Sequence, residues 1–359
     1  MIDRHTAFER FRAERSAELA AAVDITPCGI TITYYDLRLS RSVSRAIFQG
    51  EAVSAQNVAQ LLGRAFSAAG RELGVNAAAI KSVGFAAPVH ISAFIEDALS
   101  AQELFLRPET HLFVMPYISA GISGRFTAAL LTLPEGECCA AELADSLCVA
   151  HVGGGEVRCA SFGLCGAFSA SGLESGMLNA AGAVDSVTRE HDGTLCYSVS
   201  GDTDGVGLSA AGAAMALRVM LDEGIIDADG IMTDRDMLYI GEDIFVSQRD
   251  VRAFQSDRAR CAAALEVFSR RYGGRFYFSG EPFTREGFAA LLATGVIPEE
   301  LRGAGFAQGA VTSGIIRCFD PAEYERAERL AAGALDVTEE LAGEVGELYY
   351  ERLAFSEKG

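Results

Sequence analysis

EGIIDADG at 223–230 closes a helical stretch and is followed, after a short gap, by IFVSQRDVRAFQ at 244–255. The second segment starts with an apolar, strand-like run and continues in a long amphipathic pattern, so it predicts a strand leading directly into a helix. Behind it come RFYFSG at 275–280, a short strand ending in a glycine turn, and helical patterns at 321–333 and 338–353. Strands therefore alternate with helices, which is typical of mixed sheets covered by helices.

The same strand–turn–strand arrangement occurs twice in the chain. In the first copy, at 23–35, the turn TPCG separates two apolar runs, and in the second, at 147–160, the turn is GGGE. Two copies of one arrangement indicate an internal duplication, and so two lobes that each contain a mixed sheet, with a cleft between them. We expect a lead-in helix at 1–22, a first lobe at 23–143 and a second lobe at 144–359.

The composition is that of an acidic globular protein. The chain has 359 residues, half of them apolar, and a net charge of −19, so it is long enough for two domains with a sizeable core. Its charge repels phosphate backbones and anionic membranes, so neither nucleic acid nor a membrane is an expected partner. No apolar run approaches the ~18 residues of a membrane helix.

The cysteines and the first residues predict a cytoplasmic protein. The nine cysteines are odd in number and none forms C-x-x-C, which favours reduced thiols and neither a zinc ribbon nor an iron–sulfur cluster. The N-terminal segment carries alternating charges and lacks the apolar stretch of a signal peptide. We interpret the adjacent Cys138 and Cys139 as surface-loop thiols, and His151 as a core residue that makes one hydrogen bond.

Taken together, these segments resemble the ATPase module of the reductive activators of corrinoid proteins, within the sugar-kinase, Hsp70 and actin superfamily. The segments at 223–230 and 244–255 are similar to that family's G-I-I-D-x-x-G and T-Q-x-D-I-R-x-x-Q. SGEPF at 279–283 stands where the family has its adenosine loop, A-G-x-F-G, and Gly303 with 309–310 matches its G-N-x-x-x-x-G-A. The resemblance spans about 22–355 and implies an α/β fold of two duplicated, ribonuclease-H-like lobes with mixed sheets.

The resemblance also implies a nucleotide site with altered phosphate loops. Residues 24–28 stand in the place of the family's D-I-G-T-T. Pro27 has no backbone N–H, so one donor of the phosphate cradle is lost. Its D-I-G-T-N-G-E becomes 150–156, with Ala150 in place of the acid that holds Mg²⁺, and Ser169 replaces a glutamate of G-P-A-F-E-G. These motifs establish no cofactor. ATP or ADP with Mg²⁺ is the candidate ligand. No catalytic residue is assigned. The expected binding residues are Asp24, Thr26, Gly153, Gly154, Gly155, Glu156, Gln255, Arg258, Ser279 and Gly280.

Two of these features have a simpler structural interpretation. Gly153–Gly155 form either an anion-binding nest of backbone N–H groups or a tight turn that needs positive φ, with Glu156 in solvent. Arg258 either flanks a ribose or phosphate or is a solvated helix charge near Asp257.

Three functions remain open at this point. The altered loops favour a binding or regulatory protein that acts on a corrinoid methyltransferase system and hydrolyses ATP at or near background. The second is an active ATP-dependent activator that drives a corrinoid protein towards Co(I). Because this sequence carries no iron–sulfur domain, such an activator would work with a separate electron donor. The third is an unrelated small-molecule-binding protein. The expected partner is a corrinoid protein or a methyltransferase component, and the sequence does not predict an oligomeric state.

Overall fold

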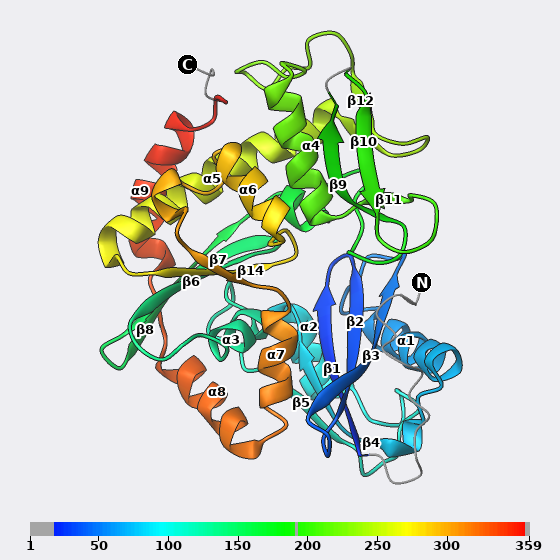
Figure 1. Ribbon diagram of the computed structural model, residues 1–359. Coiled ribbons are helices and arrows are strands. Elements are labelled where there is room, and N and C mark those ends of the chain that lie inside the picture. The colour runs from blue at the N-terminus through cyan, green and yellow to red at the C-terminus, as the bar shows by residue number, and fades with distance from the viewer. Residues whose placement is uncertain (1–17, 191–192, 356–359) are drawn as a thin grey trace. The chain divides into compact units, whose positions relative to one another are not determined.

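The computed structural model describes residues 18–190 and 193–355, which form two compact units (Figure 1). Unit 1 comprises the chain up to Leu133 together with Gly309–Ala334. Unit 2 comprises Pro134–Gln308 and the chain from Leu335 onward. Each unit has its own sheet, so the expected α/β class with mixed sheets is confirmed.

Within the residues that the structure describes, the sheet of unit 1 has five strands in the order β3-β2-β1-β4-β5. β1 pairs antiparallel with β2, and β2 with β3, whereas β1 with β4 and β4 with β5 are parallel. The hairpins predicted in this region are therefore confirmed. The strands are β1 (Leu19–Thr26), β2 (Gly29–Asp36), β3 (Arg41–Gln49), β4 (Ile80–Ala86) and β5 (His111–Val114).

Helices cover this sheet. α1 begins at Val58 because the preceding residues form a turn in which the Asn57 side chain accepts a hydrogen bond from the Ser54 amide (2.8 Å). α1 ends at Gly74, whose φ of 68° suits glycine. The helices of the unit are α1 (Val58–Leu73), α2 (Val89–Ala98), α3 (Gly124–Leu130), α7 (Ala310–Arg317), α8 (Pro321–Gly333) and the short 3₁₀ helix Ala77–Ala79.

The lead-in helix expected at 1–22 falls mostly outside the described residues. Its last part is strand, because 19–22 belong to β1 and are fully buried between β2 and β4. Alanine favours a helix in isolation, but here hydrogen bonding on both edges and burial on both faces decide the conformation.

The sheet of unit 2 repeats the strand arrangement of unit 1. Its order is β15-β14-β6-β7-β8-β16, with β6–β7 and β7–β8 antiparallel and β6–β14 and β14–β15 parallel. β6 is therefore the counterpart of β1, β7 of β2 and β8 of β3. The strands are β6 (Cys138–Leu143), β7 (Ser146–Gly153), β8 (Glu156–Gly163), β14 (Phe276–Gly280), β15 (Gly305–Ala307) and β16 (Leu335–Asp336).

This pairing explains why the units differ from the lobes expected on either side of residue 143. β6 lies before that boundary, but it is hydrogen-bonded to β7 and β14 and so belongs to unit 2. The segment 309–334 returns to unit 1, where Gly314 of α7 packs so closely on α3 that a Cβ there would lie 2.0 Å from the Ala128 carbonyl oxygen.

Unit 2 carries further elements on this sheet. α5 begins with a capping box in which Ser247 and Asp250 exchange side-chain-to-backbone hydrogen bonds. The helices are α4 (Ala210–Asp222), α5 (Gln248–Tyr272), α6 (Arg285–Ala293), α9 (Thr338–Glu351) and the short 3₁₀ helices Ala167–Ser169 and Glu299–Leu301. The smaller strands are β9 (Ala183–Arg189), β10 (Leu195–Val199), β11 (Gly207–Leu208), β12 (Met237–Tyr239) and β13 (Phe245–Ser247).

Among the helices of the described ranges, none is both long enough and apolar enough to cross a membrane.

Candidate functional site

β6 and β14 are neighbouring parallel strands in the unit 2 sheet, so their carboxyl ends lie side by side. Glu142 pairs with Ser279, and Leu143 with Gly280, in parallel register. Gly280 has a φ of 127°, and a Cβ on it would lie 2.2 Å from the Leu143 carbonyl oxygen. Only glycine fits between these strand ends, and the chain turns there into α6.

Two carboxylates lie close together in sequence here, one near the end of β6 and one in the turn to β7. Glu142 is 3% exposed, and Asp145 lies in the turn itself. The Asp145 Oδ1 accepts a hydrogen bond from the Ser169 hydroxyl (2.7 Å) and another from the Ser171 hydroxyl. These acidic groups stand at the end of the strand that corresponds to β1, the strand that carries Asp24.

A buried carboxylate on α5 holds the loop that supplies these serines. Asp257 is 1% exposed and accepts hydrogen bonds from the amides of Cys165 (2.6 Å) and Ala167 (2.8 Å). Burial raises the pKa of Asp257, and the two amide hydrogen bonds act in the opposite direction. Gly166 between them adopts a φ of 83°. α5 therefore fixes the position of Ser169 beside Asp145.

The glycine-rich turn at 153–156 lies at the opposite end of the strands of the same sheet. Because β7 is antiparallel to β6, Leu147 lies beside the end of β6 and Val152 beside its start. At about 3.3 Å per residue, the length of β7 separates the glycine-rich turn from the carboxyl end of β6 by about 20 Å. Gly153, Gly154, Gly155 and Glu156 therefore cannot share a site with Ser279 and Gly280, and their expected grouping is corrected.

The local geometry of that turn is that of a tight hairpin. Gly154 and Gly155 have φ values of 59° and 81°, which is left-handed backbone that favours glycine. The Glu156 side chain is exposed and forms an ion pair with Arg158 (2.9 Å).

Ala150 was expected in the place of a magnesium-binding acid, but it lies in the middle of β7. It pairs with Ala140 on one side and Cys159 on the other. No acid is therefore missing at this position. The second hairpin turn of the duplication is instead 144–145, with Asp145 in the turn and Glu142 near the end of the strand before it. The signal that could have located it is the run of six residues, 138–143, that directly precedes the turn.

The thiols of this run were expected on a surface loop. The structure instead places them within β6. Cys138 and Cys139 are buried, and burial raises the pKa of Cys139 to about 12. His151 is only partly buried, so the expected core position is wrong, but its Nε2 makes the expected kind of contact, a hydrogen bond with the Glu137 carboxylate (3.2 Å), and its ring stacks on Tyr272.

In unit 1, Asp24 is held by an arginine. The Arg125 guanidinium donates from Nε to Asp24 Oδ1 (2.7 Å) and from its Nη2 to Oδ2 (3.4 Å). Both side chains are almost fully buried, at 12% and 8% exposed. In the adjoining turn, the Thr26 hydroxyl donates to the Gly29 carbonyl (3.3 Å).

Gln255 and Arg258 contact the chain's own C-terminal segment. Arg258 is 4% exposed, donates to the carbonyls of Arg352 and Ala354 (2.7 Å for the latter), and stacks on Phe355 at 4.8 Å. The Gln255 amide donates to Leu353 (3.0 Å). Burial, followed by the nearby Arg352, lowers the pKa of Arg258 to about 10. Arg258 is thus neither solvated nor open to a ribose, and both earlier interpretations are corrected.

The space beside the expected adenosine loop is filled by an aromatic side chain. Phe283 is fully buried and stacks on Phe278 at 5.2 Å, and the Phe288 ring lies 6.3 Å from Phe283 and 5.9 Å from Phe278. Ser279 and Gly280 therefore cover the core of unit 2.

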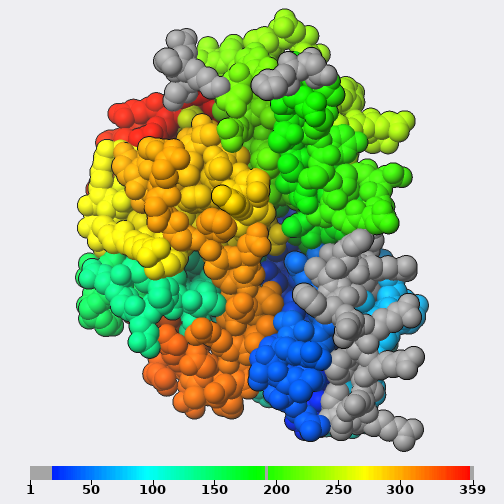
Figure 2. Space-filling model, in the orientation of Figure 1, coloured from blue at the N-terminus to red at the C-terminus, as the bar shows by residue number. Residues whose placement is uncertain are grey.

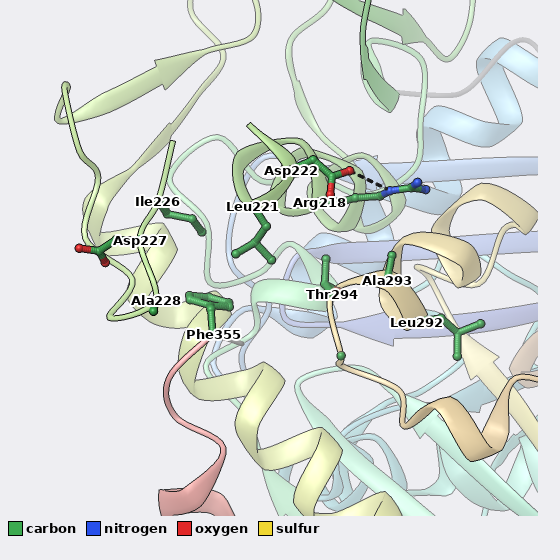
Figure 3. Close-up of a pocket in the computed structure, with 11 residues that line it drawn as sticks. Arg218, Leu221, Asp222, Ile226, Asp227, Ala228, Leu292, Ala293, Thr294 and Phe355 are labelled. Carbon is green, nitrogen blue, oxygen red and sulfur yellow. Dashed lines mark hydrogen bonds and ion pairs between the residues drawn. The ribbon is translucent and has the colours of Figure 1, made fainter. Parts of the chain in front are cut away.

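A pocket of about 290 Å³ lies next to the C-terminal segment. It is bounded by the end of α4, by 226–228, by 292–295 and by Phe355. Figure 3 shows the Phe355 ring below Leu221 and Ile226, with Asp227 directed outward and Arg218 paired with Asp222. Its lining combines apolar side chains with the polar groups of Arg218, Asp222, Asp227 and Thr294.

We compared the chain with known proteins. No family model matches it. In sequence it is 27% identical over 214 residues to the corrinoid activation enzyme RamQ of Eubacterium limosum, a match that covers 50% of this chain and 36% of that enzyme. The chain thus spans about a third of its curated relative.

In structure it is similar to a reductive activator for a corrinoid, iron–sulfur protein, with a TM-score of 0.81 and 13% identity. That match covers 96% of this chain and 67% of the activator. The chain therefore shares the fold of the part of that activator that it matches, and the fold class that the motifs predicted is confirmed.

Proposed function

We propose that this chain is a corrinoid-activation protein that binds its partner through the actin-like fold and does not hydrolyse ATP. The fold shared with a reductive activator and the sequence similarity to a corrinoid activation enzyme support the first part. The second part rests on one observation, the buried pair of Asp24 and Arg125 in the first hairpin of unit 1.

Phosphoryl transfer requires Mg²⁺ and oriented N–H groups to neutralise the charge that develops on phosphate oxygens. Asp24 does not fit a magnesium ligand, because a guanidinium already neutralises both of its oxygens. Pro27 has no N–H to offer, and the Thr26 hydroxyl is used within the turn. Within 18–190 and 193–355, no cluster of three or more potential metal ligands was found.

ATP hydrolysis is expected to be no faster than in buffer. The physical reason is the loss of charge neutralisation at the first hairpin, which costs several kcal/mol at the transition state, or ~10²-fold or more in rate. Phosphate release from ATP with Mg²⁺ measures it directly, and calorimetric titration with and without Mg²⁺ shows whether nucleotide binds at all.

A second candidate is an active ATP-dependent activator, and one observation favours it. The second hairpin keeps two carboxylates, Glu142 near the end of β6 and Asp145 in the turn. Turnover that is well above buffer and is abolished by Asp145→Asn, while Glu156→Gln leaves it unchanged, would establish this candidate and refute the first.

The expected partner is the corrinoid-carrying subunit of a methyltransferase. The net charge of −19 favours a basic or neutral partner surface and speeds association at low salt. Titration of the full chain with the corrinoid protein is expected to give a complex that weakens as salt is raised. No complex at low salt, together with a small molecule that is retained through purification, would instead indicate a metabolite-binding protein.

A further inference from the structure

Unit 1 contains a larger pocket, of about 710 Å³, that none of the motifs accounts for. It lies between the end of α2, the strand β5 and the start of α8, and α8 is drawn in orange at the surface in Figure 2. The volume falls within the ~300–1,000 Å³ of small-molecule sites. The apolar part of its lining is Ile95, Leu99, Leu112, Phe113, Val114 and Phe319.

Aromatic rings form one wall of this pocket and hold each other in place. Phe113 meets Phe319 edge-on, with centroids 5.6 Å apart, and meets Tyr324 edge-on at 5.2 Å. The Tyr324 hydroxyl donates to the Val114 carbonyl (3.0 Å), which anchors α8 to β5. This wall is therefore preorganised, and ring faces attract cations.

The charged side chains that line the pocket are both carboxylates, Glu96 and Glu325, and no lysine or arginine is among the lining residues. Glu96 has no ion-pair partner within the residues that the structure describes. Glu325 makes an exposed pair with Arg329 (3.6 Å), which is weak and readily exchanged. His111, which also lines the pocket, lies 3.5 Å from the Ser82 hydroxyl through its Nδ1.

Burial is the main cause of the raised pKa values of two groups at this pocket, and neighbouring carboxylates add to it. Burial and then Asp97 raise the pKa of Glu96. Burial raises the pKa of Tyr324 to about 12, with further contributions from Glu328 and Glu96. A cation in the pocket would relieve this accumulation of negative charge, whereas an anion would increase it.

We propose that this pocket binds an organic cation, a primary amine or guanidinium joined to an apolar carbon skeleton, with the charge at Glu96 and the apolar part against Phe113 and Tyr324. The site lies within unit 1 and does not depend on the proposed function. The same chemistry is offered by a free amine and by an arginine side chain of another protein.

Calorimetric titration of the full chain with phenethylammonium tests the charge requirement, because phenethyl alcohol has nearly the same shape without the charge. We expect the amine to bind at least about tenfold more tightly, which corresponds to ~1.4 kcal/mol. A blocked arginine amide forms the second arm. Tighter binding of the arginine derivative points to a protein segment as the source, and tighter binding of the amine points to a metabolite.

Two substitutions locate the site. Glu96→Gln removes the charge but keeps the shape, and it should reduce amine affinity about tenfold. Glu72→Gln makes the same change of charge on the exposed end of α1, away from the pocket, and should leave the affinity unaltered. Equal affinity for amine and alcohol, no binding of either cation, or equal losses in the two variants would each overturn the proposal.

Discussion

Asp24→Ala is expected to lower the free energy of unfolding by about 3–5 kcal/mol, because it leaves the Arg125 guanidinium buried without its counter-ion. The two side chains are 12% and 8% exposed and joined by two hydrogen bonds. Water therefore has little access to the orphaned charge, and β1 would have to separate from α3 to admit it. Urea unfolding followed by circular dichroism measures the loss.

An exposed pair in the same unit provides the control. Glu51 and Arg64 are 2.9 Å apart but more than half exposed, so Glu51→Ala should cost less than about 1 kcal/mol. The double variant Asp24→Ala, Arg125→Met removes both charges and should recover most of the loss. Similar losses for Asp24→Ala and Glu51→Ala would show that Asp24 is not neutralised by Arg125, and would remove the main support for a protein without hydrolysis.

The fold could be predicted from local signals because they agree with the tertiary structure. The strand–turn–strand segments at 23–35 and 147–160 form the hairpins β1–β2 and β7–β8, the segment at 244–255 forms β13 and the start of α5, and 321–333 forms α8. In each case an apolar run of the right period and clear end signals fall within one element.

The candidate site could not be predicted, because it depends on which strand lies next to which. The turn at 153–156 is rich in glycine and looks like a phosphate loop, but glycine there only serves the reversal of a hairpin. The true counterpart of the first turn follows β6, whose small residues, Cys-Cys-Ala-Ala, resemble a continuing loop. The position of this strand at the centre of the sheet becomes clear only from its pairing with β7 and β14.

The assignment of Arg258 was wrong for a related reason. The guanidinium of a lone arginine on an amphipathic helix can contact solvent, a ligand or a distant carbonyl group. The sequence near α5 does not distinguish these three partners. The carbonyls that it binds belong to 352–354, almost a hundred residues later in the chain. Such long-range hydrogen bonds leave no periodicity in the sequence.

The close contact between Gly280 at the end of β14 and Leu143 at the end of β6 predicts the second large effect on stability. Gly280→Ala is expected to destabilise the protein by at least about 3 kcal/mol, from an unfavourable φ and from steric overlap. The φ of 127° is strained for any side chain, and the new Cβ would lie 2.2 Å from the Leu143 carbonyl oxygen. That oxygen belongs to backbone at the end of the central strand β6, so it cannot rotate away as a flexible side chain would.

The matched control is Gly163→Ala at the end of β8 in the same sheet. Gly163 has no atom within 4 Å of an added Cβ and no positive φ, so alanine there should change the free energy of unfolding by less than about 1 kcal/mol. The two variants add the same methyl group to the same sheet, and thermal unfolding compares them directly. Equal stability of both would mean that β6 and β14 are farther apart at their ends than the structure shows. In that case Glu142 would not be positioned beside Ser279, and the turn that follows β6 would lose its support as a candidate site.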